Sequence, residues 1–504
     1  MKTQEYKRRL AVLCLSVTCA LPLRAAASQP TFIGEEPAVL TNHAIKIRGA
    51  SLNYTAELGR IAIRDVETGE PHGYMFDTAY RVASPRESRP VTFVWNGGPG
   101  APSALLHFSV AGPTRLENGQ LVDNLETWLL ASDLVFVDPI GTGFSRPVTA
   151  AYDSEFYGTL GDVASVTEFV RAWCLVHGAE TAPLFLVGES WGAGRAANVA
   201  YALEKRGFRV NGLVLISGGW GLNRSFISPE LRSALQIVDM AVVALYHGRS
   251  DPGLGRDAAS VRRAAETWAR ETYAPALSRI KILSDAERTA IVTQLARFTG
   301  LPETQIDRKT LVITPRQFRT GLLKGDAKEL YIFDLRRTSA PEDRAAEVIP
   351  AFLRNNLGYG TSLPYLGLDD IRHGFAPTGT YPESVNERWN YATAKLSPEE
   401  VKAAIQAASA SGAGPPRLGP PLPAIEEAIA INPRLKVLVA AGMYDGFLPC
   451  TIGEESERTL PPNLRGSFTF HCYPGGHAMY LDAPARVELS RDIEKFISHT
   501  AKPN

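Results

Sequence analysis

The 504-residue chain has the composition of a folded globular protein, with 45% hydrophobic and 21% charged side chains, which excludes the disordered and fibrous classes. Lysine plus arginine and aspartate plus glutamate both number 53. The chain therefore lacks the basic excess typical of proteins that bind nucleic acid or acidic membranes, and we expect no nucleic-acid partner. A chain of this length suits two or three domains, or an α/β core with a large insertion.

Residues 1–27 have the pattern of a signal peptide that is cleaved on export. Three basic residues at 7–9 precede a mostly apolar run over residues 10–23, and small residues at 25–28 suit a cleavage site. The run is short for a membrane span, so we expect an exported protein, periplasmic or secreted, with no stable membrane association. A lipid anchor at Cys19 is the competing interpretation, although the preceding residues are a poor match to that signal.

Removal of this segment leaves three cysteines, Cys174, Cys450 and Cys472. Three thiols allow at most one internal disulfide, in a compartment that would permit it. Cys450 and Cys472 are the expected pair because both flank strands near the C-terminus that carry chemistry. The sequence by itself does not establish the bond.

The predicted elements begin with short alternating runs between residues 43 and 83, which indicate antiparallel strands. Compact apolar runs follow at 91–95, 134–137, 184–187, 213–216, 437–440 and 468–470. The runs between residues 91 and 216 alternate with helical stretches, a pattern typical of strands buried on both faces of a mostly parallel sheet. The sequence therefore predicts an α/β core, with a β-rich N-terminal segment and helices beside the sheet.

Residues 225–424 differ from the rest, because charged, alanine-rich and helix-like stretches dominate there. The proline-rich stretch 412–423 cannot be regular helix or central strand, and it predicts the return of the chain to the sheet. We expect a mainly helical cap over residues 225–424, inserted between two parts of the core, residues 28–224 and residues 425–504. The pocket residues of this cap cannot be assigned without tertiary contacts.

The candidate nucleophile is Ser190, in the glycine-flanked sequence 188–192 between a predicted strand and a predicted helix. A serine nucleophile needs such a sharp strand-to-helix turn, and the flanking glycines let neighbouring backbone pack closely around it. The helix N-terminus also stabilises negative charge. The motif alone arises often by chance, so its context carries the prediction. The structural alternative is a glycine-rich turn whose serine caps a helix.

The serine needs a base, and the base needs a carboxylate that orients it. His477 follows the last predicted strand, where a loop can present an imidazole at the C-terminal edge of the sheet; His107 is the second candidate. Asp445 follows the strand predicted near residues 437–442 and is the expected acid. Its structural alternative is an aspartate that starts a turn. Ser190, Asp445 and His477 occur in the chain order of an α/β-hydrolase triad.

An oxyanion hole is predicted in the glycine-rich loop at residues 95–100, directly after a strand. Glycines there permit a backbone N–H to point at an oxyanion, and the residue after the nucleophile supplies a second donor. The expected donors are the N–H groups of Gly98 and Trp191.

Five motifs together resemble one family: WNGGPG at 95–100, DPIGTGFS at 138–145, GESWG at 188–192, YDGFLP at 444–449 and GGH at 475–477. In this order they resemble the serine carboxypeptidase family of the carboxypeptidase C and cathepsin A type, most of all its bacterial branch, with the α/β-hydrolase fold. The resemblance extends from about residue 40 to the C-terminus, and it is weak across the helical cap.

The resemblance implies release of C-terminal amino acids from peptides with a free C-terminal carboxylate, through an acyl-enzyme. It also implies that Asn96 and Glu189, assisted by the N–H of Gly97, hold that carboxylate. A glutamate can hydrogen-bond a carboxylate only if the two share a proton, so binding should strengthen at acid pH.

The sequence departs from the family pattern in three places. Ala101, Pro102 and Ser103 replace the usual Cys-Ser-Ser, so a disulfide anchored there in relatives is absent. Val110 replaces a glutamate of the carboxylate-binding network, which predicts a weaker acid preference. Trp191 replaces a tyrosine, which leaves its backbone donor intact and changes only the shape of the pocket.

Three other functions compete with a carboxypeptidase. An esterase or acyltransferase on the same scaffold is the main alternative, because Val110 loosens the argument for a peptide carboxylate. An aminopeptidase of the same fold and a non-catalytic binding protein are lesser ones. We expect no metal and no organic cofactor, because no ligand-spaced cluster, dinucleotide motif or phosphate loop is present. The oligomeric state is left open.

Overall fold

The computed structural model describes residues 37–83, 89–222, 225–341, 344–368, 385–386, 388–394, 396–411 and 425–502. The expected signal peptide, residues 1–27, and the proline-rich stretch 412–423 lie outside these ranges. Within these ranges, no helix has the length and apolar character needed to cross a membrane.

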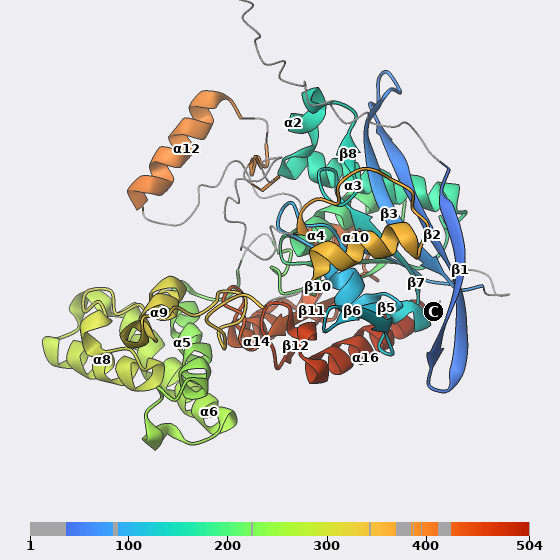
Figure 1. The fold of residues 1–504 in the computed structure, drawn as a ribbon. Coiled ribbons are helices and arrows are strands. Elements are labelled where there is room, and N and C mark those ends of the chain that lie inside the picture. The colour runs from blue at the N-terminus through green and yellow to red at the C-terminus, as the bar shows by residue number, and fades with distance from the viewer. Residues whose placement is uncertain are drawn as a thin grey trace, which may run out of the picture.

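A ten-stranded sheet forms the centre of the molecule (Figure 1). Its strand order is β1-β2-β3-β7-β4-β9-β10-β11-β12, and β8 pairs with β3. Its strands are β1 (Val39–Ile47), β2 (Ala50–Arg64), β3 (Pro71–Arg81), β4 (Val91–Trp95), β7 (Asp133–Asp138), β8 (Arg146–Pro147), β9 (Leu184–Glu189), β10 (Val210–Ile216), β11 (Lys436–Gly442) and β12 (Phe468–Tyr473). A separate hairpin consists of β5 (Thr114–Glu117) and β6 (Gln120–Asp123).

The sheet changes character at β7. The pairs β1/β2, β2/β3 and β3/β7 are antiparallel, whereas β7, β4, β9, β10, β11 and β12 pair parallel to one another. Strands β4 and β9 are buried along their whole length, as expected for continuous apolar runs covered on both faces. The predicted β-rich opening and mostly parallel core are confirmed.

Alternate side chains of each central strand enter two different cores. In β9, Leu184 and Leu186 contribute to one apolar cluster, and Phe185 and Val187 to the other, because successive side chains of a strand point to opposite faces. The first cluster includes buried residues of α3 (Thr159–Val176) and α4 (Trp191–Glu204). The second includes the buried face of α16 (Ala483–Thr500). The sheet is therefore the middle layer of an α/β/α arrangement.

The remaining helices are short ones near the core and a group between β10 and β11. Near the core lie α1 (Ala104–Leu106), α2 (Asp153–Phe156), α13 (Ile425–Ile431), α14 (Cys450–Thr459) and α15 (Pro462–Arg465). Between β10 and β11, ahead of α13, the chain forms α5 (Pro229–Tyr246), α6 (Ala258–Trp268), α7 (Ala274–Ser278), α8 (Asp285–Thr299), α9 (Pro315–Gly321), α10 (Ala345–Asn355) and α12 (Pro398–Ser411).

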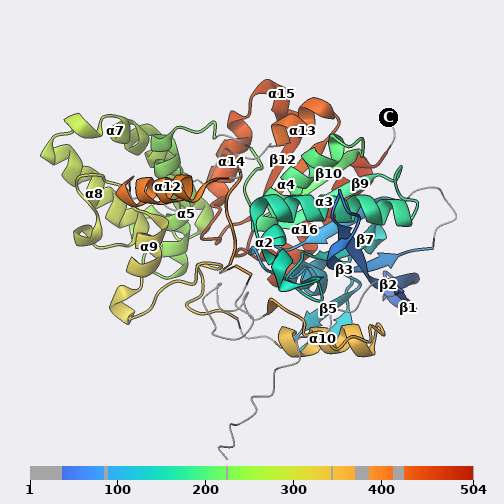
Figure 2. The same ribbon diagram turned by 90° about the horizontal axis from the view of Figure 1, so that it is seen from above.

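Helices α5 to α9 form a lobe at one end of the sheet, beside β12 and α14 (Figures 1 and 2). This lobe has an apolar cluster of its own, and α8 begins with a capping box formed by Ser284 and Glu287. Helix α10 lies elsewhere, because its Ile349 and Leu353 join the apolar cluster of the main sheet. A cap that spans residues 225–424 stays a proposal.

Candidate active site

Ser190 lies at the turn between β9 and α4. Its backbone has φ 56° and ψ −125°, a positive φ that few residues other than glycine adopt and that costs about 1–3 kcal/mol. The Ser190 N–H donates to the carbonyl of Ile216 on β10 at 2.8 Å. Such local strain is typical of sites where the fold holds a side chain in a fixed position.

The turn can close because Gly188 has no side chain. A Cβ added to Gly188 would lie 2.0 Å from the carbonyl oxygen of Gly192. The end of β9 and the first turn of α4 therefore meet backbone to backbone, as the glycine spacing predicted.

Asp445 and His477 meet at the ends of two neighbouring parallel strands. Asp445 follows β11 and His477 follows β12, and these strands pair through Gly442 and Tyr473 at their last residues. The Asp445 Oδ2 and His477 Nδ1 atoms are 2.9 Å apart. Both residues are buried, and the Asp445 Oδ1 atom accepts the N–H of Phe447 at 2.8 Å.

The surroundings of His477 favour its protonated form. Burial lowers the pKa of His477, but the charge and hydrogen bond of Asp445 and the charge of Glu189 outweigh burial and raise the pKa above its ordinary value. The Nε2 atom is buried and has no hydrogen-bond partner among the described residues. It lines the same cavity as Ser190 without a hydrogen bond between the two; such bonds often close only around bound substrate.

Residues outside the predicted site hold the histidine in place. The His477 N–H donates to the carbonyl of Phe333 at 2.6 Å, and the Ser217 hydroxyl donates to the His477 carbonyl at 2.5 Å. The rings of Phe333 and Phe447 lie 5.2 and 5.3 Å from the imidazole centre. No motif in the sequence marks Phe333, because it reaches the site from the helical region between β10 and β11.

The second candidate base, His107, is a core residue. It is 2% exposed, stacks against Phe108 and Phe136, and its Nε2 atom is 2.8 Å from the hydroxyl of Tyr80. It does not line the cavity that contains Ser190.

The loop predicted to supply the oxyanion hole packs directly on the turn at Ser190. A Cβ added to Gly97 would lie 2.6 Å from both the carbonyl oxygen of Glu189 and the backbone nitrogen of Trp191. Gly97 and Gly98 line the cavity beside Ser190. The structure thus brings the candidate donor loop and the candidate nucleophile into contact.

Glu189 is buried beside the nucleophile and has two hydrogen-bond donors. The amide nitrogen of Asn96 donates to its Oε2 atom, and the hydroxyl of Tyr480 donates to its Oε1 atom at 2.7 Å. Burial raises the pKa of Glu189, although the charge of His477 and both hydrogen bonds oppose the rise. Sequence reasoning paired Asn96 with Glu189 and missed Tyr480, which carries no motif signal beyond its place three residues after His477.

Val110 lies in the hydrophobic core and does not line the cavity. Its side chain is fully buried. The family resemblance implies a glutamate at this position, and in this structure apolar packing occupies its place.

The cavity around Ser190 has one wall from the core and one from the region between β10 and β11. The second wall consists of Tyr331, Phe333, Asp334, Arg337, Ala340 and Pro341. Arg336 fastens it to the core, because it binds both oxygens of Asp334 and donates to the Asp482 Oδ2 atom at 2.6 Å. The arrangement encloses a serine, an imidazole and a carboxyl group.

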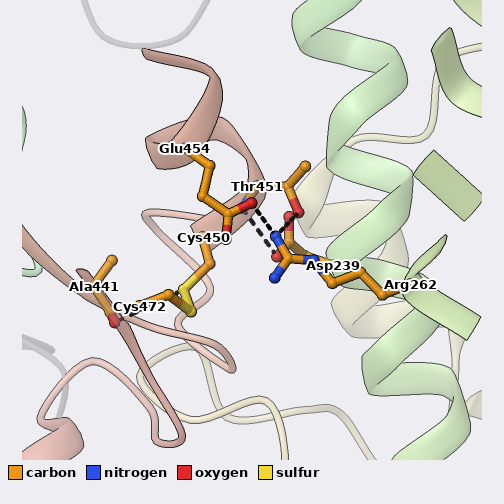
Figure 3. The surroundings of a disulfide bond; sticks show 7 residues. All are labelled: Asp239, Arg262, Ala441, Cys450, Thr451, Glu454 and Cys472. Atoms are coloured by element: carbon orange, nitrogen blue, oxygen red, sulfur yellow. Dashed lines mark hydrogen bonds and ion pairs between the residues drawn. A yellow bond between two sulfur atoms is a disulfide. The ribbon is translucent and has the colours of Figure 1, made fainter. Parts of the chain in front are cut away.

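A disulfide joins the segments that carry the candidate acid and base (Figure 3). It links Cys450, the first residue of α14, to Cys472 in β12, with the Cα atoms 5.6 Å apart. This is the expected cysteine pair. Figure 3 also shows Asp239 and Arg262, from helices of the lobe, beside the start of α14. Within the part of the chain that the structure describes, no three His, Cys, Asp or Glu side chains are placed to hold a metal ion.

Comparison with known proteins agrees with the motifs. The serine carboxypeptidase family model matches residues 62–206. The pheromone-processing carboxypeptidase KEX1 of Ajellomyces capsulatus is 35% identical over 144 residues, which are 26% of this chain and 22% of that protein. The KEX1 protein of Blastomyces gilchristii is 28% identical over 224 residues, 41% of this chain and 32% of that protein. The chain thus spans a third or less of the length of these curated relatives.

Two solved structures match most of this chain at low sequence identity. Kex1Δp, a prohormone-processing carboxypeptidase from Saccharomyces cerevisiae, has 15% sequence identity and a TM-score of 0.47, with 88% of this chain and 91% of that chain covered. The peroxisomal α/β-hydrolase Lpx1 of the same yeast has 9% identity and a TM-score of 0.32, with 90% and 91% covered. The resemblance to a bacterial branch stays a prediction.

The family match over residues 62–206 includes the loop at Gly97 and the turn at Ser190, and the strands continue into a mostly parallel sheet. Residues 62–206 of this chain therefore match the serine carboxypeptidase family, and the sheet has the arrangement of the α/β-hydrolase fold.

Proposed function

We propose that this protein is an exported serine carboxypeptidase that releases C-terminal amino acids from peptides through an acyl-enzyme. The observation that carries the proposal is the placement of the Glu189 carboxyl group, buried directly before Ser190 and lining the same cavity as His477. A hydrolase that accepts neutral esters has no evident need for a carboxyl group there. A group that binds a peptide's terminal carboxylate has to lie close to the nucleophile.

In the proposed mechanism Ser190 is the nucleophile and His477 is the general acid and base. The His477 Nε2 atom accepts the hydroxyl proton as the Ser190 Oγ atom attacks the carbonyl carbon of the last peptide bond. Asp445 holds the Nδ1–H, which fixes the tautomer and stabilises the imidazolium. The raised pKa of His477 supports this role.

The tetrahedral oxyanion would be stabilised by the N–H groups of Gly98 and Trp191. His477 then gives its proton to the departing amine, so the C-terminal amino acid leaves and the acyl-enzyme remains. A water molecule, deprotonated by His477, attacks the acyl carbonyl and releases the shortened peptide and Ser190. The contact of Gly97 with the Ser190 turn supports this placement of the donors.

Asn96 and Glu189, with the N–H of Gly97, would hold the terminal carboxylate. Two carboxyl groups attract each other only when they share a proton. The raised pKa of Glu189 favours such sharing, so substrate binding should strengthen toward acid pH.

Export rests on the sequence pattern of residues 1–27, which lie outside the described residues. The Cys450–Cys472 disulfide supports an oxidising compartment, because disulfides persist mainly in exported proteins. The proposed location is therefore periplasmic or secreted, with peptides as substrates and with no nucleic-acid or stable membrane partner.

An esterase or acyltransferase is the second candidate, favoured by the apolar Val110 in the core. The test is hydrolysis of an N-blocked dipeptide from about pH 4 to pH 8, beside the same compound with an amidated C-terminus. We expect a strong preference for the free acid that increases toward low pH. Equal rates for the two compounds, or activity confined to simple esters, would favour the second candidate.

A further inference from the structure

Tyr480 connects the loop that carries His477 to Glu189, the candidate anchor for the substrate's terminal carboxylate. It lies in the short helical turn Met479–Leu481 that follows His477, and its side chain is fully buried. The Tyr480 hydroxyl donates to the Oε1 atom of Glu189 at 2.7 Å. A buried tyrosine hydroxyl usually needs a partner, and here the partner is the carboxyl group that would hold the substrate.

The second donor to Glu189 is fixed in direction. The Oδ1 atom of Asn96 accepts the N–H of Leu106 at 3.0 Å, so the amide nitrogen faces Glu189 and can only donate. The hydroxyl of Tyr480 can donate or accept. Tyr480 can therefore stay hydrogen-bonded whichever oxygen of Glu189 gains a proton, whereas Asn96 can do so only when the proton is on Oε1.

Charged groups from three elements also influence Glu189. Burial raises its pKa, the positive charge of His477 lowers it, and the charge of Asp445 raises it. On α4, Arg195 donates to the backbone carbonyl of Asn96 at 2.8 Å. Arg195 is paired at 2.6 Å with a buried aspartate of α3, so its charge is largely balanced.

We propose that Tyr480 is a positioning residue of the carboxylate anchor, and that its hydrogen bond sets the pH range in which Glu189 shares a proton with the substrate's terminal carboxylate. This inference rests on the proposed function. A hydrogen bond to an ionised carboxylate is stronger than one to a neutral carboxyl group. Loss of the hydroxyl therefore disfavours the ionised form of Glu189 more than the protonated form.

The test is the pH dependence of KM for the free-acid dipeptide with the variant Tyr480→Phe. The midpoint at which binding weakens should move to higher pH by about one to two units. A role in packing alone would lower stability or kcat without moving this midpoint. An unchanged midpoint overturns the inference.

Tyr473→Phe is the matched control. Tyr473 is also a buried tyrosine, and its hydroxyl donates to a carboxylate, the Oδ2 atom of Asp492, at 3.1 Å. This variant loses the same hydroxyl group but leaves Glu189 untouched, so its midpoint should equal that of the wild type.

Two further measurements separate the possible causes. With Glu189→Gln already present, Tyr480→Phe should move no midpoint, because glutamine does not titrate; a shift of the original size would assign the effect to another group and overturn the inference.

Labelling of Ser190 by a fluorophosphonate shows whether Tyr480→Phe has a folded site. If it does not, 3-fluorotyrosine at position 480, a stronger donor, should move the midpoint to lower pH, and no movement overturns the inference.

The substrate preference of the wild-type protein distinguishes failure of this inference from failure of the proposed function. A wild-type protein with no preference for the free acid overturns both. A clear preference in the wild type, with the same midpoint in Tyr480→Phe, overturns only the role of Tyr480.

Discussion

At the scale of single residues, Ser190 combines an unusual backbone with a position at the cavity. It lies between the last residue of β9 and the first residue of α4, with a φ of 56°. The surrounding fold, rather than the preference of serine, maintains this backbone conformation. The neighbouring Glu189 and the Asp445–His477 pair are buried. The candidate chemistry therefore lies on side chains whose positions the core determines.

The first prediction concerns Ser190→Ala. Because the nucleophile is lost while the turn keeps its backbone, hydrolysis of the free-acid dipeptide should fall by at least about 10³-fold with the melting temperature nearly unchanged. Ser165→Ala is the control, since Ser165 is a buried serine of α3 outside the cavity. Near-wild-type activity in Ser190→Ala would remove the triad assignment.

At the scale of elements, the loop after β4 and the turn after β9 lie so close together that no side chain fits between them. The contact at Gly97 involves only backbone atoms on the other side, the Glu189 carbonyl and the Trp191 nitrogen. Backbone cannot move aside as the end of a flexible side chain can. The two elements are thus held at a distance that only glycine permits.

The second prediction compares two glycine substitutions measured by dipeptide hydrolysis and thermal unfolding. Gly97→Ala should lower kcat/KM by about 10²-fold or more, because the loop has to move away from the nucleophile. Gly194→Ala, in α4, meets no atom within 4 Å and should stabilise the protein by about 0.5–1 kcal/mol. Full activity of Gly97→Ala would show that the close contact is not needed.

The disulfide is a second connection between elements, and it leads to the third prediction. Cys450 and Cys472 are 22 residues apart in the chain, and closing a loop of this size stabilises a fold by about 3 kcal/mol in the chain-entropy model. The double variant Cys450→Ser, Cys472→Ser should unfold at a lower urea concentration than the wild type, with a free energy of unfolding that is smaller by about 3 kcal/mol. Its control is Cys174→Ser, which removes the free buried thiol. Identical unfolding of the double variant and the wild type would contradict the expected stabilisation.

At the scale of the whole molecule, the helical lobe meets the core where α5 packs against α14. Asp239 of α5 accepts the N–H of Thr451 at 3.4 Å, and its Oδ2 atom is buried with no hydrogen-bond partner in the described part of the chain. Arg262 of α6 donates to Glu454 of α14 (Figure 3). The Asp239 carboxyl group therefore lies at the contact between the helical lobe and the core.

The fourth prediction is a pH dependence of stability at this contact. Burial raises the pKa of Asp239 to about 7, although the charge of Arg262 opposes the rise. The folded protein then holds a proton that the unfolded chain releases near pH 4, so this contribution to stability is complete below about pH 4 and is lost as the pH rises through about 7.

Thermal unfolding at about pH 5 and pH 8 tests this expectation with the variant Asp239→Asn. Asparagine carries no titratable proton, so the variant does not lose this contribution as the pH rises. Between pH 5 and pH 8 its free energy of unfolding should therefore increase by about 1–3 kcal/mol relative to that of the wild type. If the difference in free energy of unfolding between variant and wild type is the same at both pH values, Asp239 has an ordinary pKa.

The sequence by itself predicted the fold class, the similarity to the serine carboxypeptidase family and those candidate site residues that lie within motifs. Alternating and continuous apolar runs indicated the mixed sheet, because burial on one or both faces determines which residues a strand can carry. The turn at Ser190 was predictable for a related reason, since the glycines beside it are required by backbone contacts within a few residues. The cysteine pair was expected from its place beside two strands.

Only the tertiary structure decided which distant side chains complete the site. Tyr480 reaches Glu189 across 291 positions of the chain, and Phe333 receives the N–H of His477 from a region with no motif. Helix α10 likewise joins the main core instead of the lobe. Such contacts depend on how elements pack in three dimensions, and an isolated tyrosine, phenylalanine or amphipathic helix has many equivalent partners until the surrounding fold selects one.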